Sequence, residues 1–193
     1  MATQPRILAF AGSTRKDSFN KKLVRIAAQG AEVAGATVTL IDLKDFRLPL
    51  FDQDLEAAEG PPEAATKLKR LMAKHDGFLI ASPEYNSSLS PVLKNAIDWV
   101  SRAGPGETPL AAFKGKVVAL MSASPGGLGG LRGLVHLRSI LGNIGVIVLP
   151  DQIAVPTAHE AFGPDGALTD SKRQSAVQGL GRTLTEFVAK LGA

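Results

Sequence analysis

The stretch Gly77-Phe78-Leu79-Ile80-Ala81-Ser82-Pro83-Glu84-Tyr85-Asn86 indicates the fold more clearly than any other part of the chain. Its first five residues form a short apolar run, which is typical of a strand buried on both faces of a sheet. The run ends in a polar turn stiffened by Pro83, and a helical pattern begins at Pro91. Ligands of open parallel sheets bind at the carboxyl ends of the strands. We therefore expect a binding site where this strand ends.

The rest of the chain repeats this alternation of apolar runs and amphipathic helical patterns. We predict strands at residues 6–11, 37–43, 77–81, 116–121 and 146–149. We predict helices at 18–34, 62–74, 91–103 and 169–191, and one that follows a glycine-rich turn at 122–130 and ends near 141. Such alternation predicts an α/β fold with helices on both faces of a parallel sheet. Five strands suit a single doubly wound domain over 1–193 with strand order 2-1-3-4-5, whose switch point lies between the first and third strands.

Apolar residues at helical spacing identify the faces that the predicted helices bury. In the helix at 18–34 these residues are Leu23, Ile26, Ala27 and Ala31. In the helix at 91–103 they are Leu93, Ile97 and Val100. The residues from 128 to 141 form a broad apolar helix, so we expect most of it to pack on the sheet and the remainder to be available for a dimer interface. We predict a loop at 44–60, which is rich in Pro, Asp and Leu.

The composition limits the classes of function. The chain has 193 residues, of which 45% are hydrophobic, and a formal net charge of +4. This hydrophobic content argues against disorder. The chain contains no cysteine, which excludes disulfides, thiolate catalysis, iron–sulfur clusters and zinc–thiolate sites. No Lys/Arg run exceeds two residues, so a nucleic-acid site has little support, whereas the mild positive charge suits anionic substrates and phosphorylated cofactors.

Neither a targeting signal nor a catalytic histidine cluster stands out. The segment Met1–Arg6 is too short and polar for a signal peptide, and no apolar run approaches the roughly 18 residues of a membrane span. We therefore expect a cytoplasmic protein. The histidines, His75, His136 and His159, are scattered along the chain, so we expect neither a metal site nor a Ser-His-Asp group.

The turn after the first strand, residues 12–20, carries donors suited to phosphate. Its neutral side-chain donors are Ser13, Thr14, Ser18 and Asn20. Arg15 adds a forked cation, and the start of the next helix offers free N–H groups and a favourable dipole. The turn matches neither G-x-x-x-x-G-K-[ST] of triphosphate sites nor G-x-G-x-x-G of dinucleotide sites. It therefore suggests a phosphate monoester, with a simple helix cap at Asp17 or Ser18 as the alternative.

Two later loops suit a planar ring. Tyr85 and nearby backbone groups offer the flat apolar contact and the hydrogen bonds that a flavin ring needs. The alternative is an ordinary turn, with Tyr85 as an edge aromatic and Asn86 in an Asx turn. The turn 122–130 has four glycines in its last five positions, so its backbone can approach a ligand closely. Its N–H groups would stabilise negative charge on a reduced flavin, whereas the alternative is a flexible connector.

Three segments together closely resemble the NADPH-dependent FMN reductase family, which includes bacterial quinone, chromate and azo-dye reductases. They are Gly12-Ser13-x-Arg15-x-x-Ser18-x-Asn20, Pro83-Glu84-Tyr85-Asn86 and Leu93-Lys94-Asn95-Ala96-Ile97-Asp98-Trp99. The resemblance runs from about Arg6 to Leu149 and also includes Leu48–Asp52. Its most specific part is Pro83–Trp99. One departure is Ser90-Pro91, where many relatives have Pro-Gly.

The resemblance implies a flavodoxin-like fold that binds FMN without a covalent link and forms dimers or dimers of dimers. It assigns the phosphate to Ser13, Arg15, Ser18 and Asn20. It places along the ring and ribityl chain Pro83, Glu84, Tyr85 and Asn86. On the other side of the ring, it places Ser122 and the glycine loop, including Gly126.

The resemblance also implies an activity. NAD(P)H would reduce FMN by hydride transfer, and a small oxidised acceptor would then replace the nicotinamide over the same face. The flavin carries this chemistry, so we expect no catalytic residue from the protein. The alternatives are a flavodoxin-type electron carrier, a non-catalytic binding protein on the same fold and, more distantly, a nucleic-acid binder. Flavodoxin-type carriers are usually strongly acidic, unlike this chain, and the basic balance slightly favours NADPH over NADH.

Overall fold

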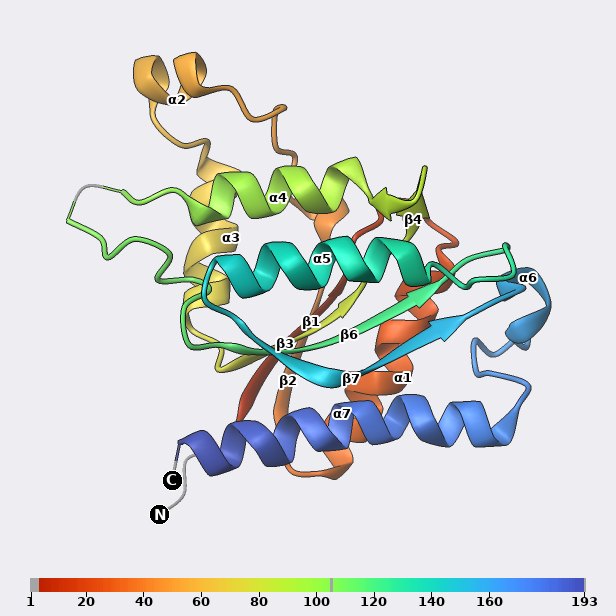
Figure 1. The fold of residues 1–193 in the computed structure, drawn as a ribbon. Coiled ribbons are helices and arrows are strands. Elements are labelled where there is room, and N and C mark those ends of the chain that lie inside the picture. The colour runs from red at the N-terminus through yellow and green to blue at the C-terminus, as the bar shows by residue number, and fades with distance from the viewer. Residues whose placement is uncertain (1–3, 105, 193) are drawn as a thin grey trace.

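The computed structural model describes residues 4–104 and 106–192, and a five-stranded parallel sheet lies between two layers of helices (Figure 1). The sheet contains β1 (Arg6–Ala11), β2 (Thr37–Asp42), β3 (Gly77–Ala81), β6 (Val117–Ala123) and β7 (Ile147–Val155). Their order is β2-β1-β3-β6-β7, with each neighbouring pair parallel. Counted along the chain, these five strands have the order 2-1-3-4-5, which confirms the predicted doubly wound topology.

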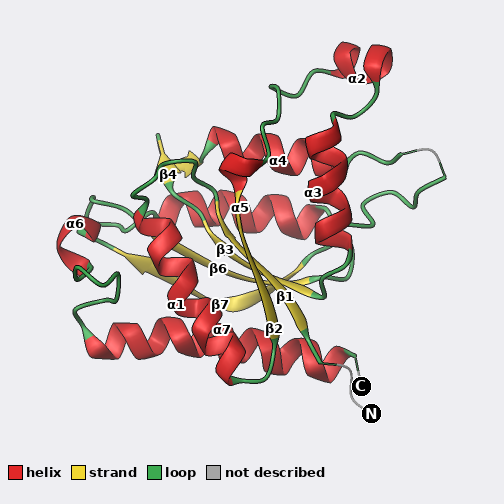
Figure 2. Cartoon of the chain, turned by 180° about the vertical axis from the view of Figure 1, so that it is seen from behind, coloured by secondary structure: helices red, strands yellow, loops and turns green. Residues whose placement is uncertain are grey.

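The helices cover the two faces of the sheet, as Figures 1 and 2 show from opposite sides. One face carries α1 (Phe19–Val33) and α7 (Ser171–Leu191). The other carries α3 (Glu63–Ala73), α4 (Pro91–Ser101) and α5 (Leu131–Asn143). The short elements are the 3-10 helix η1 (Leu43–Asp45), α2 (Gln53–Glu59), α6 (Ala158–Ala161) and the hairpin of β4 (Glu84–Tyr85) and β5 (Ser88–Leu89).

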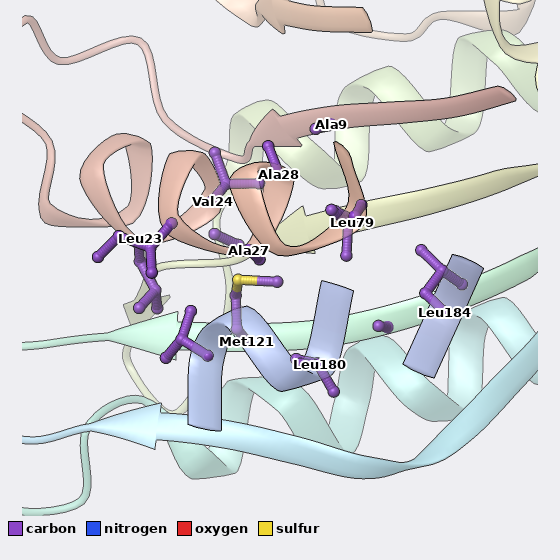
Figure 3. Close-up of a cluster of buried hydrophobic side chains, with 14 of the residues drawn as sticks. Ala9, Leu23, Val24, Ala27, Ala28, Leu79, Met121, Leu180 and Leu184 are labelled. Atoms are coloured by element: carbon purple, nitrogen blue, oxygen red, sulfur yellow. The ribbon is translucent and has the colours of Figure 1, made fainter. Parts of the chain in front are cut away.

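Strand alternation divides the core into two halves. Ile7 and Ala9 of β1 pack with α1 and α7, whereas Leu8 and Phe10 pack with α3, α4 and α5. Figure 3 shows the first half of the core, where side chains from α1 and α7 pack against side chains of the sheet such as Met121 of β6. The buried residues predicted for α1 and α4 are confirmed, because all of them lie in these two clusters.

Two glycines let α1 and α7 approach each other closely. A Cβ atom added to Gly181 of α7 would overlap the carbonyl oxygen of Ala27, and one added to Gly30 of α1 would overlap that of Gln178. Only hydrogen fits at these positions, so the contact depends on the missing side chains. The crossing fixes α1 under the sheet and so sets where the loop before α1 lies.

The structure differs from the sequence-based prediction in the irregular parts. β7 extends to Val155 rather than ending at Leu149, and its register against β6 shifts between Val148 and Gln152, a stretch that contains Pro150. Since β7 is an edge strand, a proline at a bulge is tolerated there. The segment predicted to be a loop at 44–60 overlaps η1 and contains α2. α2 buries no residue, so no apolar periodicity marked it.

Candidate functional site

The loops after β1 and β3 lie side by side at the carboxyl edge of the sheet, as the predicted switch point requires. The Gly12 N–H donates to the Ala81 carbonyl at 2.9 Å. Ser90 Oγ donates to the Gly12 carbonyl at 2.6 Å and accepts from the Leu93 N–H at 3.2 Å. Ser90 therefore joins the first loop to the start of α4.

The loop 13–18 holds several unused hydrogen-bond donors. In the part of the chain that the structure describes, the backbone N–H groups of residues 13, 14, 16 and 17 make no hydrogen bond. Ser18 is the N-cap of α1, but its side chain caps none of the helix N–H groups. Arg15 is exposed beside them, and its own N–H donates to Ser13 Oγ at 3.3 Å. A loop with this many free donors beside a helix start is suited to an anion.

Asn20 ties this loop to the end of β6. Its Nδ2 donates to the Ala123 carbonyl at 2.8 Å, and its Oδ1 accepts from the Ala123 N–H at 2.9 Å. The side chain is 3% exposed. A direct phosphate contact from Asn20 stays a prediction, whereas its role in joining the first and third loops is plain.

The second loop is a tight hairpin rather than an isolated turn. Asn86 and Ser87 join β4 to β5 with φ angles of 50° and 66°. Such a two-residue turn needs positive φ at both positions, which Asn accepts more readily than Ser. The hairpin leaves Tyr85 48% exposed, while Pro83 before it is buried. The sequence-based prediction missed the hairpin because the usual Asn-Gly pair is absent.

Glu84 points toward α5 and acts as a cap for that helix. Its Oε2 accepts from the Gly133 N–H at 2.9 Å, and its Oε1 accepts from Arg132 Nη2 at 2.9 Å. Burial alone would raise the pKa of Glu84, but the Gly133 N–H and the Arg132 guanidinium outweigh it and lower the pKa below its ordinary value. The carboxylate thus fixes the hairpin to α5, and its predicted contact with a flavin stays a prediction.

The third loop differs from the prediction at Ser122, which lies within β6 and not in a turn. Ser122 is fully buried, and its Oγ has no hydrogen-bond partner among the described residues. A Cβ atom on Gly130, whose φ is 90°, would overlap this oxygen. Gly126 is exposed further along the loop, and the N–H groups of residues 127 and 128 make no hydrogen bond in the described part of the chain.

Together these loops fit FMN. Free N–H groups with Arg15 form an anion site at one end, free N–H groups at residues 127 and 128 lie in the third loop, and the exposed ring of Tyr85 belongs to the loop after β3. FMN has a phosphate at one end and a planar ring with polar edges at the other. The donor set therefore suits both of its ends.

The block Leu93–Trp99 has a structural role that sequence reasoning did not find. The Pro49 carbonyl accepts from Asn95 Nδ2 and from Trp99 Nε1, each at 2.8 Å. Asn95 Oδ1 accepts from the Phe51 N–H at 2.8 Å, and the Phe51 ring meets the Trp99 ring edge to face. One turn of spacing puts Asn95 and Trp99 on the same side of α4, so they hold the segment that leads to α2. Figures 1 and 2 show α2 standing apart from the helix layers.

Two further features bear on the site. Within residues 4–104 and 106–192, no helix has the length and apolar character needed to cross a membrane. Over the same residues, no three His, Cys, Asp or Glu side chains gather as a metal site would need. His75 is buried between α3 and β2, where its ring contacts the Leu71 carbonyl and Thr39 Oγ1.

Comparisons with known proteins agree with this geometry. The model of the NADPH-dependent FMN reductase family matches residues 5–160. An NAD(P)H-dependent FMN reductase of Pseudomonas aeruginosa is 34% identical over 192 residues, covering 99% of both chains. A quinone reductase of Escherichia coli K12 is 38% identical over 141 residues, covering 73% of this chain and 71% of that protein.

A solved structure gives the same answer. The flavoenzyme NAD(P)H:(acceptor) oxidoreductase of Paracoccus denitrificans matches with a TM-score of 0.81 and 30% identity. The match covers 98% of this chain and 100% of that one. The chain therefore belongs to the NADPH-dependent FMN reductase family.

Proposed function

We propose that this chain is an NAD(P)H-dependent FMN oxidoreductase that reduces a small oxidised acceptor of the quinone class. FMN, when bound, would supply the transfer of hydride and electrons between NAD(P)H and the acceptor. The observation that carries the proposal is the group of unused N–H donors in the loops after β1 and β6, at one edge of the sheet. Membership of the FMN reductase family supports the same function.

The protein's own residues bind and orient in this proposal. Ser13, Arg15 and Ser18 belong to the loop whose N–H groups receive the phosphate. The N–H groups of 127 and 128 face the polar edge of the ring, where they favour added negative charge. Pro83, Tyr85, Asn86 and Gly126 border the ring, whereas Asn20, Glu84 and Ser122 hold or underlie the loops.

The proposal also covers the location, the oligomeric state and further acceptors of the protein. We propose a cytoplasmic homodimer or homotetramer, with chromate and azo dyes as further acceptors. Exposed apolar side chains on and before α5 support self-association, since Leu128 is 53% exposed, Leu131 41% and Val135 57%. Size-exclusion chromatography with light scattering on the wild type and on Val135→Glu tests this, and an unchanged monomeric mass in both would contradict it.

The activity is tested by the visible spectrum of protein saturated with FMN and freed of excess, before and after anaerobic NADPH. We expect a bound flavin spectrum that bleaches. Bound flavin that stays oxidised would favour an electron carrier, and a protein that retains no flavin would overturn the proposal.

The phosphate assignment has its own test. Arg15→Ala should weaken FMN binding at least about tenfold, because a hydrogen bond to a charged group contributes about 1.5–3 kcal/mol. The matched control is Arg25→Ala, an exposed arginine further along α1. Fluorescence titration of FMN measures both, and equal affinities for the two variants would refute the role of Arg15.

A further inference from the structure

A pocket of about 470 Å³ lies next to the phosphate loop on its β2 side. Thr14 of that loop forms one wall, the turn after β2 forms a second, and the start of α4 forms a third. We call it the β2-side pocket. Its volume lies within the roughly 300–1,000 Å³ usual for small-molecule sites. Apart from Thr14, it shares no residue with the three loops of the flavin site, so it is a separate place at the same edge of the sheet.

The floor of the β2-side pocket is apolar and its rim is cationic. Leu43 and Phe46 are buried, and with Val92 and Ala96 they line the pocket. Such a surface suits one face of an aromatic base.

The rim carries Lys44 and Arg47, both exposed. Within the described residues, neither side chain makes a hydrogen bond or an ion pair. The Asp42 carboxylate near Lys44 is already paired with Lys21 at 2.5 Å. Asp45 is the acidic neighbour on the same turn, so the rim keeps a positive balance. A lysine and a forked guanidinium together suit a phosphate group.

The reaction requires a ligand that reaches beyond the ring. A pyridine nucleotide that places its nicotinamide on the flavin carries its adenosine end away from the ring, where a neighbouring pocket can bind it. Toward the third loop, Arg132 at the start of α5 is already engaged by Glu84. Toward β2, the side chains of Lys44 and Arg47 form no ion pair within the described residues, and Asp42 beside Lys44 is paired with Lys21. Charge complementarity therefore favours the β2 side.

We propose that the β2-side pocket binds the adenosine 2′-phosphate end of NADPH, with the adenine on the apolar floor and the 2′-phosphate at Lys44 and Arg47. This inference rests on the proposed function and deepens it, because it makes NADPH the preferred nucleotide. NADH lacks the 2′-phosphate, so it gains nothing from the two cations.

The test uses the double variant Lys44→Ala/Arg47→Ala. Both side chains are exposed, and neither makes a hydrogen bond or an ion pair within the described residues. The control variant, Arg182→Ala/Lys190→Ala, removes the same charge from the exposed side of α7. Steady-state rates with one quinone acceptor give KM for NADPH and for NADH. Calorimetry with 2′,5′-ADP on FMN-loaded protein gives binding without any turnover, because this ligand cannot reduce the flavin and FMN already fills the phosphate loop.

We expect the pocket variant to raise KM for NADPH at least about tenfold, to leave KM for NADH within about twofold, and to abolish 2′,5′-ADP binding. Its FMN affinity and the behaviour of the control variant should match the wild type. An unchanged preference for NADPH in the pocket variant, or equal losses with both nucleotides, would overturn the inference and leave the proposed function standing. Wild-type protein whose bound FMN is reduced by neither nucleotide would overturn both.

Discussion

Replacing Glu84 by Gln tests whether the hairpin after β3 is held in place by its carboxylate. The substitution keeps the size and shape of the side chain but removes its charge. A carboxylate accepts hydrogen bonds at both oxygens, as Glu84 does from Arg132 and Gly133. A glutamine must turn its NH₂ group toward one of these two donors, so one hydrogen bond is replaced by a contact between donors.

The structure sets the size of the effect. The Gly133 N–H bond is partly buried and charge-assisted, a class that contributes about 1.5–3 kcal/mol. The Arg132 side chain is 59% exposed, so solvent screening limits its ion pair to at most about 1 kcal/mol. We expect Glu84→Gln to lower the free energy of unfolding by about 2 kcal/mol. For a chain of this length that corresponds to a fall in Tm of about 4–8 °C.

The effect should depend on pH in one direction. The pKa of Glu84 is lowered in the folded protein, so its contribution is complete above the unfolded-state pKa of about 4.3. It is lost as the pH falls through the lower folded-state pKa. The gap between wild type and Glu84→Gln should therefore be complete at neutral pH and should shrink in acid.

Thermal unfolding followed by circular dichroism measures this gap at each pH. Glu186→Gln, on the exposed side of α7, removes the same charge as a control. The FMN affinity of Glu84→Gln should also fall, because Tyr85 and Asn86 lose their anchored neighbour. Wild-type Tm in Glu84→Gln at neutral pH, or a gap that persists unchanged in acid, would refute the role of Glu84.

Two further predictions concern the scaffold. Gly181→Ala should destabilise the protein by about 1–3 kcal/mol, because its methyl group would meet the Ala27 carbonyl, whereas Gly179→Ala on the same helix has open space and should stabilise by up to about 1 kcal/mol. Urea unfolding compares the two, and equal shifts would contradict the close crossing. Trp99→Phe removes a donor to the Pro49 carbonyl and should cost about 1–2 kcal/mol, together with faster proteolysis of the segment 49–60. Circular dichroism in urea checks the stability, and timed digestion with a glutamate-specific protease, which can cleave after Glu56 and Glu59, checks the segment. A wild-type cleavage rate would count against the clamp.

The sequence predicted the sheet because the sheet is built from patterns that act locally. Each buried strand is a continuous apolar run, and α1 and α4 show helical spacing that matches their buried faces. The strand order followed from the number and alternation of these elements. The second half of β7 was not predicted, because a proline such as Pro150 usually marks the end of a strand. An edge strand nevertheless tolerates a proline.

The sequence predicted where the candidate loops lie but not the direction of their side chains. The sequence placed polar residues at the ends of β1, β3 and β6, and the structure brings their loops to one edge. It gave no means of seeing that Glu84 turns toward α5 or that Asn20 reaches Ala123, since both partners lie far along the chain. Lys44 and Arg47 belong to no recognisable sequence motif. Their place at the rim of a pocket is visible only in the structure.

Hydrogen bonds between side chains and backbone explain how the site can be rigid while backbone N–H groups in its loops stay free. Ser90 bonds to the Gly12 carbonyl, Asn20 to Ala123 and Glu84 to Gly133, so side chains join each loop to a neighbouring element. The backbone N–H groups of the loops are thereby left for a ligand, and little ordering remains to be done when it binds. A residue that joins two loops should therefore affect FMN binding even without touching it. Loss of such a residue should lower the unfolding free energy and the affinity together, whereas loss of Arg15 should lower the affinity alone.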